Sequence, residues 1–298
     1  MIEYLYLGRV GYGEALRVQE ELVELRRQGR VENVLLLLEH PPVLTLGRNA
    51  QRANVLASDE LLARRGVTLH EINRGGDVTY HGPGQLIGYP IFDLRSLRNT
   101  SGGRLGPVDF VRLMEEALIG LCGVYRVRAS RIFGLTGVWH TAGGGSLDGS
   151  TVKGSVPKAS VPPPGAAKIA AIGIHVSRGI TSHGFAFNVT TDLRDFDLIN
   201  PCGITGCPVT SLELEMARGE AARREPLPSL EALAHEAARL FGQVFGEQVL
   251  AIESLDALRA GAEAAAAGAP EFPAEDTPLQ IPPEVERLRG VKEHPVRV

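Results

Sequence analysis

The sequence predicts one α/β or α+β domain over roughly residues 1–250, and three observations predict it. Amphipathic helical patterns recur along the chain, and short apolar segments of strand length lie between them. Glycine- and proline-rich turn signals separate several of those segments, as in hairpins. With 298 residues, of which 44% are hydrophobic, the chain has ample apolar material for an independent core.

The first part of the chain alternates strands and helices. Continuous apolar character at 34–38 indicates a strand buried on both faces, and Ser58 is a helix-capping residue. The predicted elements are a strand at 2–7, a helix at 14–28, strands at 34–38 and 43–46, a short helix at 59–65 and a hairpin within 74–93.

The second part continues this alternation around two segments without periodicity. The predicted elements are a helix from Pro107 to Gly123, one or two strands within 124–139, an antiparallel pair at 169–176 and 184–189, and a helix with its apolar face at 230–244. Residues 140–167 are rich in Gly, Ser, Ala and Pro, and we expect a flexible surface insertion there. Alanine, glutamate and proline dominate 251–298, where we expect a disordered or loosely attached tail.

Composition excludes several classes of protein. A formal charge of −4 provides no basic footprint for nucleic acid. No apolar run reaches the roughly 20 residues that a membrane-spanning helix needs, and the N-terminus does not read as a signal peptide. Three cysteines are too few for a disulfide framework and suit a reducing compartment, so a cytoplasmic location is expected. Cys202 and Cys207 have no second pair to complete a zinc site, so no metal is expected.

The stretch from Arg74 to Asp93 has the composition of a ligand-binding hairpin. Gly75 and Gly76 permit positive φ angles and the close approach of another molecule. Pro83, between two glycines, makes the following turn tight. His81 lies in this turn, and His183 also lies beside a glycine; a histidine so placed is more often a structural hydrogen-bonding residue than a catalyst.

Cys202 is the first candidate nucleophile. Pro201 fixes the approach of the chain, and Gly203 leaves its own N–H open to an oxyanion, although most free cysteines are simply small buried residues. Cys207 competes for this role, whereas Cys122 lies in a helical pattern and is expected to be structural. Lys168 opens an apolar strand and would ordinarily point into water; facing Cys202, its ammonium would favour the thiolate.

Several short motifs together resemble the octanoyltransferases of lipoate biosynthesis. In chain order they are EHPPVLTLGR (39–48), RGGDVTYHGPGQ (74–85), GVW (137–139), KIAAIG (168–173), HGFAFN (183–188) and NPCGITG (200–206), followed by TSL (210–212). Their order along the chain and their residues resemble those of that family, and the resemblance covers about residues 1–245. The insertion at 140–167 departs from the family, and it carries two rival lysines, Lys153 and Lys158.

The resemblance implies a fold, an activity and partners. The fold is an α/β (α+β) domain with a mixed-sheet core, similar to the catalytic domain of biotin and lipoate protein ligases. The activity is transfer of an octanoyl group from octanoyl-acyl carrier protein to a lysine of lipoyl domains, in 2-oxoacid dehydrogenase E2 subunits and the glycine cleavage H protein. No cofactor, metal, nucleic acid or membrane is implied.

The resemblance also implies the site. Cys202 matches the nucleophile that carries the acyl group, and Lys168 matches its partner lysine. The segments that match the acyl-chain site are Arg74, Gly75, Gly76, Asp77, Val78, Thr79, Tyr80 and His81, then Ala171, Ile172 and Gly173, and finally Gly184, Phe185 and Ala186. Backbone N–H groups near Gly203 or in the Gly75–Gly76 loop are alternative donors to the oxyanion.

Three other functions stay open at this point. An ATP-dependent lipoate or biotin ligase would share the fold and would need no nucleophilic cysteine. A transferase that moves octanoyl groups between proteins would share the chemistry but differ in substrate. A catalytically silent protein that binds lipoyl domains would tolerate the loss of Cys202.

Overall fold

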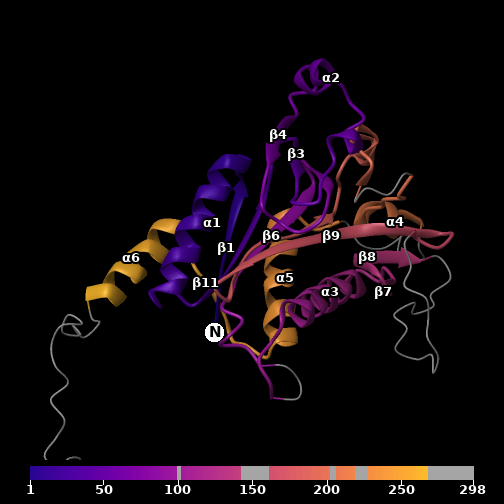
Figure 1. Cartoon of the computed structure of the whole chain (residues 1–298). Helices are drawn as coiled ribbons and strands as arrows, with labels where there is room; N and C mark the ends of the chain where they lie inside the picture. The colour runs from indigo at the N-terminus through magenta and orange to yellow at the C-terminus, as the bar shows by residue number, and fades with distance from the viewer. Residues whose placement is uncertain (99–101, 142–160, 202–205, 219–226, 268–298) are drawn as a thin grey trace, which may run out of the picture.

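An eight-stranded mixed sheet forms the centre of the computed structural model, which describes residues 1–98, 102–141, 161–201, 206–218 and 227–267 (Figure 1). The strand order is β11-β1-β2-β6-β10-β9-β8-β7. The strands are β1 (Ile2–Arg9), β2 (Asn33–Glu39), β6 (Gln85–Ile91), β7 (Ala129–Ile132), β8 (Leu135–Thr141), β9 (Ala166–Ser177), β10 (Ile180–Asn188) and β11 (Val249–Ala251). β1 pairs in parallel with β2 and β11, and the other neighbours are antiparallel.

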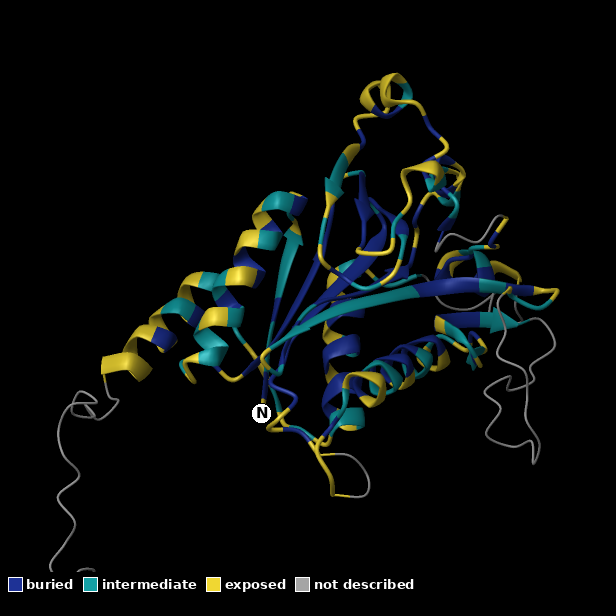
Figure 2. Cartoon of the chain, in the orientation of Figure 1, coloured by how far each residue is buried: buried dark blue, intermediate teal, exposed yellow. Residues whose placement is uncertain are grey.

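Helices cover both faces of this sheet because each presents one apolar side. α3 (Pro107–Val124) and α5 (Leu230–Phe245) pack on one face and form the larger core, with the rings of Phe110, Phe241 and Phe245 in contact. α1 (Tyr12–Arg27) covers part of the other face. Figure 2 shows most of the sheet strands buried and the outer sides of these helices exposed.

A second, three-stranded sheet stands on the α1 side of the large sheet (Figure 1). Its strands are β4 (Thr68–Glu71), β3 (Val43–Leu46) and β5 (Val78–His81), in that order, with β3 parallel to β4 and antiparallel to β5. The short segments η1 (Arg52–Asn54), α2 (Asp59–Arg64) and η2 (Leu193–Leu198) adjoin it. This sheet places the Arg74–His81 segment over the large one.

The structure differs from the sequence-based expectation at the C-terminal end. Residues from 251 onward were expected to be a disordered or loosely attached tail, yet α6 (Leu255–Ala267) is a helix packed near α1. Its Leu258 and Ala262 are buried, and Arg259 binds Glu21 with an Nη2–Oε2 distance of 2.8 Å. Alanine has the highest helix propensity, so an alanine-rich stretch with one apolar side forms a helix when a surface is available. Residues 268–298 lie outside the described part.

Smaller differences concern short elements and the insertion. β4, β11 and α4 (Leu212–Arg218) were not predicted, since short strands and helices carry little periodic signal. β8 extends to Thr141 and β9 begins at Ala166, so both ends of the expected insertion belong to strands; 142–160 lie outside the described residues. Within the described residues, no helix is long and apolar enough to cross a membrane.

Candidate active site

The Arg74–His81 segment lies against β9 and is held there by its glycines. The N–H of Gly75 donates to the carbonyl oxygen of Ile174 at 2.9 Å. A Cβ atom on Gly173 would lie 2.7 Å from the carbonyl oxygen of Gly75, a separation that real Cβ atoms do not tolerate. The glycines of two distant motifs are therefore needed so that two backbones can approach each other.

Arg74 ties this segment to β3. Its Nη2 donates to the carbonyl oxygen of Thr45 at 2.8 Å and to the Thr45 hydroxyl at 3.0 Å, and its Nη1 donates to the carbonyl oxygen of Gly75 at 2.9 Å. The side chain is buried. Arg74 thus brings a permanent positive charge to the wall of the cavity described next.

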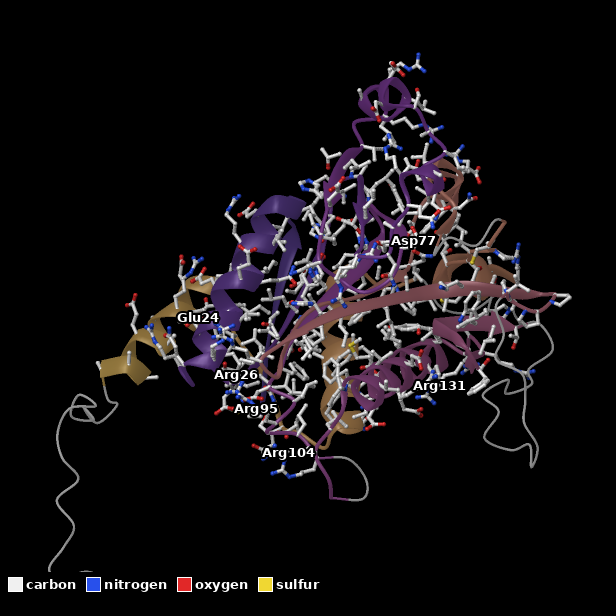
Figure 3. The ribbon with its side chains drawn as sticks, viewed as in Figure 1. Glu24, Arg26, Asp77, Arg95, Arg104 and Arg131 are labelled. Carbon is white, nitrogen blue, oxygen red and sulfur yellow. The ribbon has the colours of Figure 1, made fainter. Side chains whose placement is uncertain are left out.

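Asp77 ties the same segment to the chain that precedes Cys202. Its carboxylate accepts from the amide of Asn54 at 2.7 Å, and the carbonyl oxygen of Asn54 accepts from the N–H of Asn200 at 2.7 Å. Figure 3 places Asp77 on the side of β9 that carries the small sheet. Hydrogen bonds therefore connect one predicted acyl-binding segment to a residue two positions before the predicted nucleophile.

A cavity of about 390 Å³ brings most of the predicted site residues together. It is lined by the Arg74–His81 segment, by β9 and β10, and by the turn between β7 and β8. The predicted residues that line it are Arg74, Gly75, Gly76, Asp77, Val78, Thr79, His81, Lys168, Ala171, Ile172, Gly173, Gly184, Phe185 and Ala186. Its size and largely apolar lining suit a small acyl group.

Among the predicted site residues that the structure describes, Tyr80 does not belong to this lining. Tyr80 packs on the opposite face of β5, where its hydroxyl donates to Asp195 at 2.7 Å and its ring contacts Phe196. Alternate side chains of a strand point to opposite faces, so Thr79 and His81 face the cavity and Tyr80 cannot. Cys202 lies outside the described residues.

Ala171 and Ala186 line the cavity together with Lys168. They are directly opposite each other on β9 and β10, so both side chains lie on one face. Both also line a second, smaller cavity, which they share with Lys168, Pro201 and Val209. The two cavities thus share Lys168 and these two small side chains in their walls.

Lys168 is buried between these cavities, with 5% of its surface exposed. Its backbone N–H donates to the carbonyl oxygen of Pro208 at 2.8 Å, and its own carbonyl oxygen accepts from the N–H of Thr210 at 2.9 Å. Its ammonium nitrogen lies 4.6 Å from the centroid of the Trp139 ring. The expectation of a strand-end lysine in water is therefore wrong, because the 208–210 segment and Trp139 enclose it.

The other cysteines are packing residues. Cys207 is buried in a small cluster with Trp139 and Ile132. Cys122 is fully buried in α3, and burial in an apolar environment raises the pKa of its thiol strongly, which keeps it unreactive at neutral pH.

The polar end of the cavity contains residues that were not predicted. Tyr12, from the start of α1, and Tyr89, from β6, both line it. His40 lies behind them, with its ring centroid 5.1 Å from that of Tyr12. A tyrosine inside an otherwise apolar strand needs a hydrogen-bond partner, and this requirement was the only signal for Tyr89 in the sequence.

The partners of His40 define its protonation state. Its Nδ1 lies 2.7 Å from the carbonyl oxygen of Val10, which only accepts, so Nδ1 carries the hydrogen. Its Nε2, 2.7 Å from the Tyr89 hydroxyl, then accepts the hydrogen bond that this hydroxyl donates. Burial lowers the pKa of His40 to about 4, so the ring is neutral at pH 7.

His81 and His183 are also neutral. Burial lowers the pKa of His81 to about 3 and that of His183 to about 4, and the Arg74 charge acts in the same direction on both. The Nδ1–H of His81 donates to the amide oxygen of Gln85 at 2.8 Å, which leaves Nε2 as an acceptor. His183 has a φ of 55°, and its backbone N–H donates to the Gln19 side chain at 2.8 Å. Neutral imidazoles keep the polar end free of further positive charge.

These lowered pKa values predict an acid-sensitive fold. Each histidine has an ordinary pKa of 6.5 when unfolded and about 3 or 4 when folded, so between those values the unfolded state binds more protons. These three histidines should therefore not change the free energy of unfolding above pH 6.5. That free energy should fall below that pH by up to about 1.4 kcal/mol per histidine for each pH unit.

Denaturant unfolding at a series of pH values measures this effect. The His40→Gln variant should show a shallower loss of stability between pH 6.5 and 4.5 than the unsubstituted protein, because one of the three titrating groups is gone. An unfolding free energy that does not change over this range would contradict the assignment of buried, neutral histidines.

Comparisons with known proteins identify the family. The family model described as the lipoyl protein ligase A/B catalytic domain matches residues 11–224. The octanoyltransferase of Acidobacterium capsulatum is 58% identical over 255 residues, which cover 85% of this chain and 94% of the relative. The octanoyltransferase of Koribacter versatilis is 48% identical over 271 residues, which cover 91% of this chain and 95% of the relative.

Solved structures show the same fold at low sequence identity. A bi-partite lipoate protein ligase from Thermoplasma acidophilum aligns with a TM-score of 0.58 and 15% identity, over 89% of this chain and 91% of that chain. A lipoate-protein ligase A bound with ATP aligns with a TM-score of 0.56 and 16% identity, over 89% of this chain and 94% of that chain. These matches confirm the predicted fold class, an α/β domain with a mixed-sheet core, and at this identity they support the fold alone.

Proposed function

Because the chain belongs to the lipoyl protein ligase A/B catalytic-domain family, we propose that it transfers an octanoyl group from octanoyl-acyl carrier protein to a lysine of lipoyl-domain proteins, through a thioester on Cys202. The chain is an acyltransferase, and its relatives support octanoyl transfer in protein lipoylation. The acceptors proposed are the lipoyl domains of 2-oxoacid dehydrogenase E2 subunits and the glycine cleavage H protein.

One observation carries the proposal. Lys168 is buried at the junction of the cavity lined by the acyl-binding motifs and a smaller cavity that Pro201 and Val209 line. Pro201 immediately precedes Cys202. An amine next to that cysteine would favour the thiolate, which is the form that attacks a thioester.

In the first step, the Cys202 thiolate attacks the thioester carbonyl of the octanoyl-carrier protein. A bond from carbon to the Cys202 sulfur forms, and the bond to the carrier sulfur breaks. The departing carrier thiolate takes a proton from the Lys168 ammonium, which leaves a neutral amine. One thioester replaces another, so no ATP is consumed.

In the second step, the amine of the acceptor lysine attacks the Cys202 thioester. The amide bond forms, Cys202 leaves as a thiolate, and the neutral Lys168 amine accepts the proton that the attacking nitrogen loses. The enzyme thus returns to its starting protonation state. Since the N–H of Gly75 already donates to Ile174, we assign stabilisation of the oxyanion to N–H groups near Gly203 or to Gly76.

A direct assay tests the proposed activity. The protein is mixed with octanoyl-acyl carrier protein and an unmodified E2 lipoyl domain, without ATP, and the mass of the lipoyl domain is followed. We expect the mass of one octanoyl group to be added, and none when the acceptor lysine is replaced by arginine. Modification that requires free octanoate and ATP would instead identify a ligase, and binding without modification would identify a silent lipoyl-domain binder.

The cavity also predicts where acyl length is selected. Ala171→Leu adds three carbon atoms to the wall beside Ala186, so it should displace methylene groups of an eight-carbon chain, each worth about 0.8 kcal/mol. Transfer of octanoyl should therefore fall about tenfold or more relative to butanoyl. Competition between the two acyl-carrier proteins measures this ratio.

Ala167→Leu is the matched control. Ala167 lies on the same strand, pairs with His140 and is not part of the cavity lining, so the octanoyl-to-butanoyl ratio should not change. Equal losses for both acyl lengths in Ala171→Leu would mean that this wall does not contact the acyl chain.

A further inference from the structure

Trp139 provides a rigid aromatic surface for the Lys168 side chain. The Lys168 Nζ lies 4.6 Å from the centroid of its ring, within the range of a cation–π interaction. Trp139 is fully buried, and its indole N–H donates to the carbonyl oxygen of Leu135 at 3.4 Å, which fixes the ring plane. The residues that pack with it are Ile132, Leu135, Ala166 and Cys207.

A bulge in the pairing of β8 and β9 makes Trp139 and Lys168 neighbours. Val138 pairs with Ala170, and the next residue, Trp139, pairs with Lys168, so Ile169 is left over. Residues directly opposite in an antiparallel pair lie on one face. A regular ladder would place Ile169 opposite Trp139 and would turn Lys168 to the other face. The bulge therefore directs the lysine onto the ring.

Gly137 lies beside the Lys168 side chain and allows β8 to approach β9 closely. Its φ of 117° is one that other residues rarely adopt. A Cβ atom at this position would lie 2.5 Å from the carbonyl oxygen of Ala170 and 3.5 Å from Cε of Lys168. Only glycine fits here without moving β8 or the Ala170 carbonyl of β9, and a Cβ would lie in van der Waals contact with the Lys168 side chain.

Glu115 of α3 holds Gly137 in place. Its carboxylate is fully buried, and Oε1 accepts from the N–H of Gly137 at 3.0 Å. Oε2 accepts from Arg112 at 2.6 Å and from Arg131 at 3.1 Å, so two guanidinium groups compensate its charge. Figure 3 shows Arg131 on the side of β9 that faces α3.

We propose that Trp139 and Glu115 are positioning residues, which hold the Lys168 ammonium in place for acyl transfer. Trp139 acts by direct contact, and Glu115 acts through Gly137. The inference rests on the proposed function. Moving an ammonium out of water costs free energy, and the negative face of the ring offsets part of that cost. Contact with the ring thus fixes the position of the side-chain nitrogen that the first transfer step uses.

Single-turnover acylation of the enzyme by octanoyl-carrier protein tests the role of Trp139. Trp139→Leu should lower the maximal acylation rate about tenfold, since it removes the aromatic face. Trp139→Phe retains a face and should recover most of that rate. The carrier concentration at half-maximal rate should not change, because Trp139 is buried and is not part of the acyl cavity lining.

A matched pair of variants tests the role of Glu115. Glu115→Leu removes the acceptor for the Gly137 N–H and should slow acylation. Glu116→Leu is the control: Glu116 also binds Arg131, at 2.7 Å, but it is largely exposed and is not the acceptor for Gly137. Acylation in Glu116→Leu should match that of the unsubstituted protein.

The fluorescence of Trp139 gives a readout that is independent of activity, because the chain has one tryptophan. Replacing Lys168 with methionine removes the cation next to the ring and should change the emission of the resting protein. Glu115→Leu should change it as well, and Glu116→Leu should not. Thermal unfolding of every variant identifies any that fail to fold. If the Trp139 or Glu115 variants do not fold, the tryptophan emission of Lys168→Met becomes the test of the proposed contact.

The outcomes separate the two proposals. If the unsubstituted protein is never acylated without ATP, the proposed function fails, while the emission experiment still tests the packing. Suppose instead that the unsubstituted protein is acylated. If Trp139→Leu and Glu115→Leu are folded and are acylated at the same rate as the unsubstituted protein, the positioning role is overturned. Emission that does not respond to Lys168→Met also overturns it.

Discussion

Replacing Cys202 with serine is expected to lower octanoyl transfer by about 10⁴-fold or more, the range seen when a covalent nucleophile is removed. A thiol ionises near neutral pH when a cation is close, whereas a serine hydroxyl stays protonated and is a poor nucleophile toward thioesters. The fold should persist, since the change in volume is small. Acyl-enzyme formation and transfer to a lipoyl domain are both measured by mass.

The other two cysteines provide the controls. Cys122→Ala and Cys207→Ala remove buried thiols that pack in α3 and beside Trp139, so they should lower stability while acyl-enzyme formation persists. If Cys202→Ser were acylated as fast as the unsubstituted protein, Cys202 would have no part in the mechanism. If Cys207→Ala alone abolished acylation, the nucleophile would have been assigned to the wrong residue of the pair.

Replacing Lys168 with alanine is expected to have the second-largest effect, a loss of about 10²- to 10⁴-fold, as for a general acid–base residue. Both proposed steps use this amine, first as an acid and then as a base. The substitution also removes the cation that favours the thiolate. Acylation and transfer should therefore both slow, and the two rates are separated by presenting pre-acylated enzyme to the lipoyl domain.

The lysines at 153 and 158 are the matched controls for this result. They lie in the insertion, outside the described residues, and they were rivals of Lys168 in the sequence. Lys153→Ala and Lys158→Ala should transfer octanoyl at the rate of the unsubstituted protein. If either of these variants lost activity while Lys168→Ala remained active, the general base would be that lysine and not Lys168.

The sequence predicted the parts of the site that local motifs carry. Glycine-rich and apolar motifs at 74–81, 171–173 and 184–186 were expected to surround one ligand, and most of their residues line one cavity. Tyr80 was included because it lies inside a contiguous motif. The twofold alternation of strand residues turns its side chain away from those of Thr79 and His81, toward Asp195.

Other features depend on contacts between distant residues. The hydrogen bond from Tyr89 to His40 joins two strands, and neither residue reveals its partner in the sequence. The bulge that places Lys168 opposite Trp139 is a matter of register, which composition does not encode. The helix α6 was missed because its alanine-rich sequence resembles a linker until α1 offers a surface for Leu258 and Ala262.

The central claim is that the Cys202 sulfur carries the octanoyl group, and the intact mass of the protein tests it most directly. The protein is mixed with octanoyl-acyl carrier protein without ATP and without an acceptor, and the acylated peptide is then mapped. We expect one octanoyl group per chain, located on Cys202 and removed when a lipoyl domain is added. An unmodified mass while the lipoyl domain still becomes octanoylated, or an acyl group on another residue, would contradict the account.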